Sequence, residues 1–395
     1  MAAHSSYGFS GWDRLFRCLA SHRMQQGFDN ETNNAAELGT AVHEVVEHAL
    51  LLGVDCHDFV GTEWNGFEID EKMADSGQSY VNYIRSIKRK APHAQVLPEK
   101  KVYLSSIDGD ELWGTADTII IDLLNRTLYV CDYKNGYELV DADKDVFIQA
   151  TGKTIKGNAQ TAGYSLASLD TFDLWDKVDK VVTVIGQPNF QHMDGSIRIK
   201  EYSTGDLMEW WHAYNDSYQL LRHGVTEQNA GLHCKYCLAS GVCKSRIKRN
   251  FEILELDDGL DYMMPEQLIA VFKERLVIEK SISKIKEQVV KLARQGHKVP
   301  DYKLVRAIQR ASITKADTER LVDEMVKKGI DKSKLFHKPK LKGKTDISKL
   351  DKEIANKYFV TPEVNLTIVG VNERGTPVSP DDKPDAAKAF ENWDK

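Results

Sequence analysis

The chain has 395 residues, 42% hydrophobic and 28% charged, with a formal net charge of −6. This composition is typical of a soluble globular protein, long enough for one large core with an appended domain or for two to three small domains. No apolar run is long enough to span a membrane and the first residues lack a signal peptide's features, so we expect a cytosolic protein.

Three helices are expected before residue 90. A short helix lies within residues 10–20, and a strongly periodic second helix begins near Thr40 as its N-cap. The second helix places His43 and Glu47 one turn apart on the same face. An amphipathic helix with a hydrogen-bonded histidine and a pair of metal ligands are both compatible with this spacing. The third helix is expected at residues 70–89.

Residues 114–134 are the stretch around which the chain is organised. They are predicted to form two apolar, β-branched strands at residues 115–122 and 127–133, joined by a tight turn. A further strand is expected just before them, at residues 101–107. The spacing and composition of the two apolar strands predict a β-hairpin.

Each strand of this hairpin carries a carboxylate where an apolar residue would be expected, Asp117 and Asp132. Antiparallel pairing brings the two positions close together, and Lys134 points to the same face as Asp132 because side chains alternate along a strand. Burying two carboxylates and an ammonium is costly unless another ion compensates, and a divalent cation would do so. The alternative is a pair of exposed aspartates at strand ends beside a solvated lysine.

Two other segments also place an acidic residue two positions before a lysine, but the elements around them differ. Residues 300–303 read PDYK, and residues 98–101 read PEKK and contain Glu99. Neither segment has the apolar strand, the upstream Asp-bearing strand and the downstream helix that would build a site. We therefore predict no site at either segment.

The elements after Lys134 complete a mixed α/β sheet, because helices and strands alternate along the chain. A polar loop is expected first, and the helix that follows it carries Gln160 and Tyr164 one turn apart. The expected elements are a loop at 136–157, a helix at 158–169, strands at 180–187 and 196–202, and a helix at 206–222.

The cysteines fall into two groups. Three thiolates with C-x2-C-x5-C spacing need a fourth ligand to complete a tetrahedral or cubane site, and Cys18 is the candidate. Spacing alone does not distinguish zinc from iron–sulfur. Cys56 is expected to be a free thiol and Cys131 a small buried apolar residue. The closely spaced cysteines are Cys234, Cys237 and Cys243.

The composition shifts beyond residue 250, where a charged helix is expected at residues 265–294 and another at 314–328. We therefore divide the chain into a core at residues 1–250, a helical extension at 251–337 and a loosely structured tail at 338–395. The tail is basic at first and acidic at its end.

Several of these motifs together resemble the RecB-like branch of the PD-(D/E)XK nucleases. The resemblance lies in His43, Asp117, Asp132-Tyr133-Lys134 and Gln160-x3-Tyr164, in that order and on those elements, with Gly-Thr-x-x-His at Gly39 and Gly-Thr-Ala-Asp at Gly114. The four cysteines resemble the iron–sulfur staple of AddB-type and CRISPR-adaptation nucleases of the same branch. The whole chain also resembles an uncharacterised family of phage proteins found with replication and recombination genes.

The resemblance implies a restriction-endonuclease-like core, a mixed central sheet flanked by helices, with a C-terminal helical extension. It implies that Mg²⁺ or Mn²⁺ is held by His43, Asp117, Asp132 and the carbonyl of Tyr133, and that Lys134 orients or deprotonates the attacking water. It gives Gln160 and Tyr164 the role of positioning the DNA backbone. It also implies a [4Fe–4S] cluster on Cys18, Cys234, Cys237 and Cys243, with zinc as the alternative. Whether Glu44, Glu47 or Glu99 joins the metal shell stays open.

The expected function is that of a Mg²⁺- or Mn²⁺-dependent phosphodiesterase, an exonuclease acting on linear DNA in phage recombination or replication in the bacterial cytosol. Besides DNA, a phage single-strand-annealing or single-strand-binding protein is a possible partner, and an oligomer is compatible with the sequence. A second hypothesis is a non-catalytic DNA-binding or scaffold protein of the same machinery. A third is a structural zinc protein unrelated to DNA.

Overall fold

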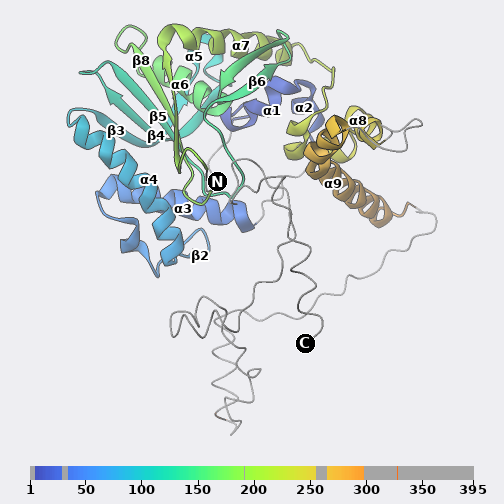
Figure 1. Ribbon diagram of the computed structural model, residues 1–395, viewed down its shortest axis with the longest axis horizontal. Coiled ribbons are helices and arrows are strands. Elements are labelled where there is room, and N and C mark those ends of the chain that lie inside the picture. Colours follow the sequence, from blue (N-terminus) through green and yellow to red (C-terminus); the bar gives the residue numbers. More distant parts are fainter. Residues whose placement is uncertain (1–4, 29–33, 191, 255–264, 298–326, 328–395) are drawn as a thin grey trace, which may run out of the picture. The chain divides into compact units, whose positions relative to one another are not determined.

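A mixed five-stranded sheet lies at the centre of the residues that the computed structural model describes, which are 5–28, 34–190, 192–254, 265–297 and 327 (Figure 1). The strand order is β3-β4-β5-β8-β9, in which β5 and β8 run parallel and the other neighbours antiparallel. The α/β prediction is therefore confirmed. The strands are β3 (Gln95–Tyr103), β4 (Trp113–Asp122), β5 (Thr127–Tyr133), β8 (Lys180–Gly186) and β9 (Ile197–Ser203).

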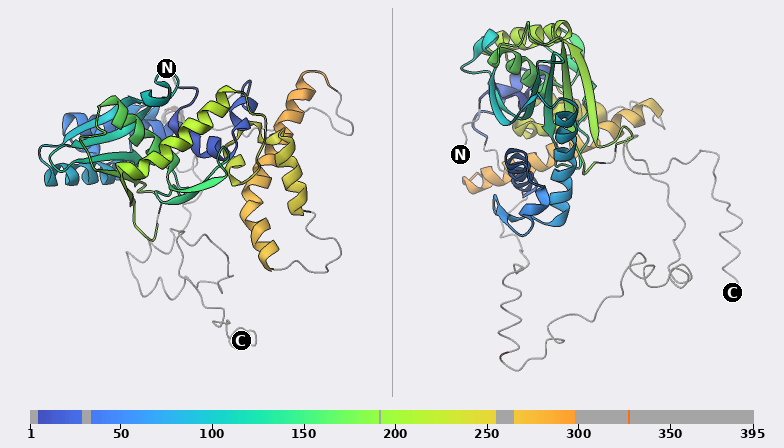
Figure 2. Two further views of the ribbon diagram at one scale, coloured as in Figure 1. Left: turned by 90° about the horizontal axis from the view of Figure 1, so that it is seen from above. Right: turned by 90° about the vertical axis from the view of Figure 1, so that its left-hand side faces the viewer.

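Helices cover both faces of this sheet (Figures 1 and 2). Helix α6 (Ala159–Thr171) and helix α7 (Thr204–Arg222) share one apolar core with α1 (Trp12–Arg17), and α3 (Asn34–Leu52) shares the other with α4 (Glu71–Lys90). Successive strand residues alternate between the two cores, as the period of a β-strand requires. Ile119 and Ile121, for example, face the α6 side, whereas Ile120 faces the α3 side.

The remaining elements are short, apart from two helices near the end of the described chain. Helix α9 lies where a charged helix was predicted, and its residues up to Leu292 belong to the same compact unit as the sheet. These elements are η1 (Phe9–Gly11), α2 (Ala20–Met24), η2 (Cys56–Phe59), β1 (Glu63–Trp64), β2 (Phe67–Glu68), α5 (Ser105–Asp108), β6 (Lys144–Ile148), β7 (Lys153–Gly157), η3 (Leu232–Tyr236), η4 (Leu238–Gly241), α8 (Lys244–Leu254) and α9 (Pro265–Arg294).

The first strand of the sheet is displaced from its predicted position. A strand was predicted at residues 101–107, but β3 begins at Gln95 and ends at Tyr103, and Ile107 lies in α5. The prediction took Pro98 and the charged residues after it as evidence against a strand at these positions. Because β3 is an edge strand, it can include a proline that would disrupt a central strand.

Two further predictions on local structure were wrong. Thr40 does not cap a helix, because α3 begins at Asn34 and the Thr40 hydroxyl donates to the carbonyl of Ala36 inside the helix, at 3.2 Å. The expected polar loop at residues 136–157 contains an antiparallel pair, β6 and β7, in which the buried side chains of Val146 and Ile155 are partners.

Two predictions fall outside the described residues, the helix at 314–328, apart from residue 327, and the tail at 338–395. Among the helices that the structure does describe, none is long and apolar enough to cross a membrane.

Candidate functional site

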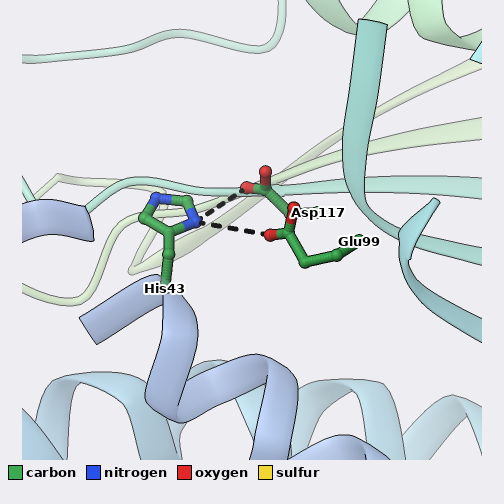
Figure 3. A group of neighbouring side chains, drawn as sticks. All are labelled: His43, Glu99 and Asp117. Carbon is green, nitrogen blue, oxygen red and sulfur yellow. Dashed lines mark ion pairs between the residues drawn. The ribbon is translucent and has the colours of Figure 1, made fainter. Parts of the chain in front are cut away.

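Three side chains from different elements meet near the middle of β3 and β4. His43 comes from α3, Glu99 from β3 and Asp117 from β4, and one potential ligand atom of each lies within 4.8 Å of the others (Figure 3). His43 Nδ1 lies 3.6 Å from Asp117 Oδ2 and 4.0 Å from Glu99 Oε1. One imidazole and two carboxylates form a donor set that suits Mn²⁺ or Mg²⁺.

Glu99 belongs to this cluster, although its segment was not expected to build a site and its place in the metal shell was left open by the sequence. Pro98 pairs with Thr118 and Lys100 with Ala116, so Glu99 lies opposite Asp117 across the β3–β4 ladder. Glu99 has φ of 42°, a left-handed conformation that is strained for a residue with a side chain. The signal that was missed is a carboxylate on an edge strand paired with the Asp-bearing strand.

Asp132 and Lys134 form the second part of the site, as their spacing predicted. Lys134 Nζ lies 2.9 Å from Asp132 Oδ2. The register that pairs Thr118 with Cys131 brings Asp117 and Asp132 to neighbouring positions, and the backbone N–H of Tyr133 donates to Asp117 Oδ2 at 2.7 Å. The hairpin thus holds the two carboxylates close together.

Gln160 forms hydrogen bonds with both the Asp132 carboxylate and the Lys134 ammonium. Its Nε2 donates to Asp132 Oδ1 at 2.9 Å, and its Oε1 accepts from Lys134 Nζ at 3.1 Å. Gln160 lies in the first turn of α6, which begins after the N-cap Asn158. Its amide is therefore engaged by Asp132 and Lys134, whereas the sequence had suggested a contact with DNA.

The backbone and ring of Tyr133 both lie against His43. The Tyr133 carbonyl accepts a hydrogen bond from His43 that raises the pKa of the histidine, and the two rings meet edge to face at 5.1 Å between centroids. The Tyr133 hydroxyl donates to Asn135 Oδ1 at 3.0 Å and lies 2.6 Å from the hydroxyl of Ser76. These contacts fix the carbonyl that the resemblance named as a metal ligand.

Tyr164 is buried beside the site, where its hydroxyl forms a hydrogen bond with Gln160. Its ring packs against Phe9, with centroids 5.2 Å apart. A Cβ on Gly114 would lie 2.9 Å from Tyr164 Cε1, so the glycine of the Gly-Thr-Ala-Asp motif makes room for this ring. Of the two glutamates on α3 left open by the sequence, Glu47 lies close enough for its charge to raise the pKa of Glu99.

The site is short of positive charge. Burial, which has the largest effect, and the negative charges of Asp117 and Glu47 together raise the pKa of Glu99 to about 8. Burial also raises the pKa of Asp117 and of Asp132 to about 6, against the opposing charge of Lys134. Burial and Lys134 together lower the pKa of His43 to about 4, so the imidazole is neutral and free to act as a ligand. A bound divalent cation would offset this excess of carboxylates.

The four cysteines of the second candidate site come together from the two ends of the core. All four side chains are buried, and the charges of Cys18 and Cys243 both raise the pKa of Cys237, after burial, which has the larger effect. The backbone N–H groups of Asn229 and Gly231 each donate to a sulfur, of Cys18 and Cys234, at 3.5 Å. Cysteines more than 200 positions apart in the chain are thus close enough for their charges to interact.

Arg14 supplies positive charge near Cys18 and Cys237. Burial lowers its pKa, and the nearby thiol groups of Cys237 and Cys18 act in the opposite direction. Its Nε is buried and has no hydrogen-bond partner among the described residues. The other two cysteines lie in the core between α3, α4 and the sheet, and the predictions of a free thiol for Cys56 and a small buried residue for Cys131 are confirmed.

A comparison with family models gives one match that covers most of the chain. Residues 4–374 match a family described as "Protein of unknown function (DUF2800)".

Proposed function

The chain belongs to the DUF2800 family, and we propose that it is a metal-dependent DNA nuclease. The observation that carries the proposal is the placement of His43, Glu99 and Asp117 around one point, beside an Asp132–Lys134 pair held by Gln160. A cluster of hard ligands next to a half-buried lysine is the arrangement that metal-assisted phosphodiester hydrolysis needs.

His43, Glu99, Asp117 and Asp132, with the Tyr133 carbonyl, would hold Mg²⁺ or Mn²⁺. The bound ion would lower the pKa of a water molecule and neutralise charge on the phosphate. The fit is supported by the raised pKa values of the three carboxyl groups, which burial produces in each case and which a bound cation would lower. Glu99 extends the ligand set that the resemblance implied.

Lys134 would act on the attacking water or on the phosphate. The charges of Asp132 and Asp117 raise its pKa against the effect of burial, which is the largest and lowers it, so it stays protonated at neutral pH. A protonated ammonium donates hydrogen bonds and can orient a water or stabilise a phosphate oxygen. Gln160 would keep the ammonium at the position from which it does so.

The resemblance to RecB-like PD-(D/E)XK nucleases supports an exonuclease of phage recombination or replication, acting in the bacterial cytosol. In this role, the nuclease would act together with a phage single-strand-annealing or single-strand-binding protein. The mixed sheet with helices on both faces is compatible with such a core.

The four cysteines would hold a [4Fe–4S] cluster. Zinc is the alternative, because four cysteine thiolates can ligate either group. Such a group would tie the N-terminal helices to the end of the core. The metal content after anaerobic purification, with the visible absorption spectrum, tests iron–sulfur against zinc.

The test of activity compares end-labelled linear DNA with closed circular DNA in Mg²⁺ or Mn²⁺, using protein purified without oxygen. We expect loss of linear DNA only, and a decrease of at least about a hundredfold in Lys134→Ala. Lys177→Ala is the matched control, because Lys177 also pairs with a nearby aspartate, Asp173, but on the surface. Cleavage of both DNAs would exclude the exonuclease. Retardation of both without cleavage would replace the nuclease with a DNA-binding protein.

A further inference from the structure

A groove lies between the β6 strand and helix α9, outside the metal site. Its volume is about 640 Å³, and its walls come from α1, the segment after Lys134, β6, η3 and α9. We call it the β6–α9 groove. Its apolar surface comes from Phe147, Tyr236 and Leu276, and its basic side chains include Lys144, Lys235 and Lys273.

Tyr236 is the most distinctive side chain of the groove. It is 57% exposed, although large aromatic residues are usually buried. The ammonium groups of Lys235 and Lys280 each lie 5.4 Å from the centre of its ring. An exposed aromatic ring between lysines is the arrangement on which proteins stack the bases of single-stranded nucleic acids.

The positive charge around Tyr236 is only partly neutralised. Lys235 forms an ion pair with Glu138, and Lys144 forms one with Asp13 at 2.9 Å. No ion pair involves Lys273 or Lys280 within the part of the chain that the structure describes. Burial lowers the pKa of Lys280 and the charge of Lys235 lowers it further, as expected where cations outnumber nearby anions. The lysines of α9 are therefore available to an anion.

The segment after Lys134 joins the groove to the metal site. Glu138 and Leu139 line the groove, and Gln187 Nε2 holds this segment by donating to the carbonyls of Gly136 and Glu138 at 2.9 and 2.7 Å. The four steps from Lys134 to Glu138 span at most about 14 Å of extended chain. A strand whose phosphate lies at the metal site can therefore extend into the groove.

We propose that the β6–α9 groove binds a short single-stranded segment of DNA, with a base stacked on Tyr236 and phosphates against Lys273 and Lys280. The groove has the volume of a small-ligand site and does not admit a duplex. The proposal rests on the proposed function, because it takes DNA as the substrate, and it assigns the single strand to a defined surface.

The test measures binding of fluorescein-labelled oligo(dT) to the full chain in EDTA, by fluorescence anisotropy. Stacking of one base contributes about 1–3 kcal/mol, so Tyr236→Ala should weaken binding at least about fivefold. Tyr236→Phe keeps the ring and should bind within about twofold of wild type. Tyr103→Ala is the matched control, because Tyr103 is also exposed, with the Lys101 ammonium 5.1 Å from its ring.

The phosphate contacts are tested separately on α9, away from the cysteines. Lys273→Ala should lower the slope of log affinity against log salt concentration by about 0.7, the value for one phosphate contact on a single strand. Lys177→Ala should leave the slope unchanged. An unchanged slope in Lys273→Ala would overturn the assignment of phosphate to this lysine.

Four outcomes test this inference, and the last two separate it from the proposed function. Equal losses in Tyr236→Ala and Tyr103→Ala would overturn the groove. The groove would also be overturned if Tyr236→Ala lost polyphosphate binding as much as oligo(dT) binding, because the site would then bind anions without stacking a base. If wild type cleaves DNA while Tyr236→Ala binds normally, the groove fails and the nuclease stands. If Tyr236 is needed for binding but no DNA is cleaved, the groove stands and the nuclease fails.

Discussion

The backbone N–H of Tyr133 donates to Asp117 Oδ2 at 2.7 Å. The peptide between Asp132 and Lys134 therefore holds the carboxylate of the neighbouring strand, and its own carbonyl lies against His43. One residue of β5 thus positions ligands from β4 and α3. The geometry of the site depends on the pairing of the hairpin as much as on the acidic side chains themselves.

Glu99→Gln should weaken Mn²⁺ binding by about tenfold or more, because it removes a carboxylate from the cluster. Isothermal titration would measure the change. Glu201→Gln is the control, because Glu201 is a strand residue whose ion pair with Lys180 is on the surface. Equal Mn²⁺ affinity in wild type and Glu99→Gln would show that Glu99 is not a ligand.

The metal-free protein should lose stability between pH 6.5 and 9. The pKa of Glu99 is raised from 4.5 to about 8, so this group favours folding below pH 4.5 and its contribution is lost as the pH rises through 8. Asp117 and Asp132, raised to about 6, lose theirs at lower pH. His43 acts in the opposite sense, but only below its ordinary pKa of 6.5.

Thermal unfolding in EDTA from pH 6.5 to 9 would measure this loss, and Glu99→Gln should flatten its upper part. Mn²⁺ affinity should rise over the same range, by about tenfold per pH unit for each proton released. If the stability of the metal-free wild type rose with pH in this window, and that of Glu99→Gln rose as well, the raised pKa of Glu99 would be contradicted.

Gly163→Ala should destabilise the protein by about 1–3 kcal/mol, because a Cβ there would lie 2.4 Å from the Tyr214 hydroxyl and 2.5 Å from Phe9 Cδ1. Gly39→Ala, by contrast, should stabilise it by about 0.5–1 kcal/mol. Gly39 lies inside α3 and a Cβ there would contact no atom within 4 Å. Urea unfolding would compare both variants, and a destabilised Gly39→Ala would show that this motif glycine has a role that the packing does not reveal.

With the proposed [4Fe–4S] cluster, Cys18→Ser should lose most of the bound iron and unfold at a lower temperature, because the cluster would join the N-terminal helices to the other three cysteines. Cys56→Ala is the control, since Cys56 is also a buried free thiol but packs between α3 and α4. Iron analysis and thermal unfolding of both variants would test the difference. Iron retained in Cys18→Ser would exclude Cys18 as a ligand.

Gln160→Ala should lower kcat and leave KM within about twofold, because Gln160 holds Asp132 and Lys134. If Gln160 instead positions DNA, as the sequence suggested, KM should rise. Steady-state cleavage of linear DNA would separate the two roles.

Much of the fold could be predicted from the sequence, because its signals are local. The strands β4, β5, β8 and β9 and the helices α4, α6, α7 and α9 lie within a few residues of their predicted positions. Apolar alternation, caps such as Asp70 and Asn158, and helical periodicity are enough to identify these elements. The pair β6 and β7 was missed because its strands are polar and short.

The sequence by itself also determined the Asp132–Lys134 pair and the hairpin that presents it, because residues two apart on one strand share a face and a tight turn sets the pairing. Only the tertiary structure decided that Glu99 joins His43 and Asp117, that Gln160 bridges Asp132 and Lys134, and that Tyr236 lies in a groove with α9. These contacts join residues on separate elements, from both faces of the sheet. Their distances depend on how the elements pack, which no local pattern of side chains encodes.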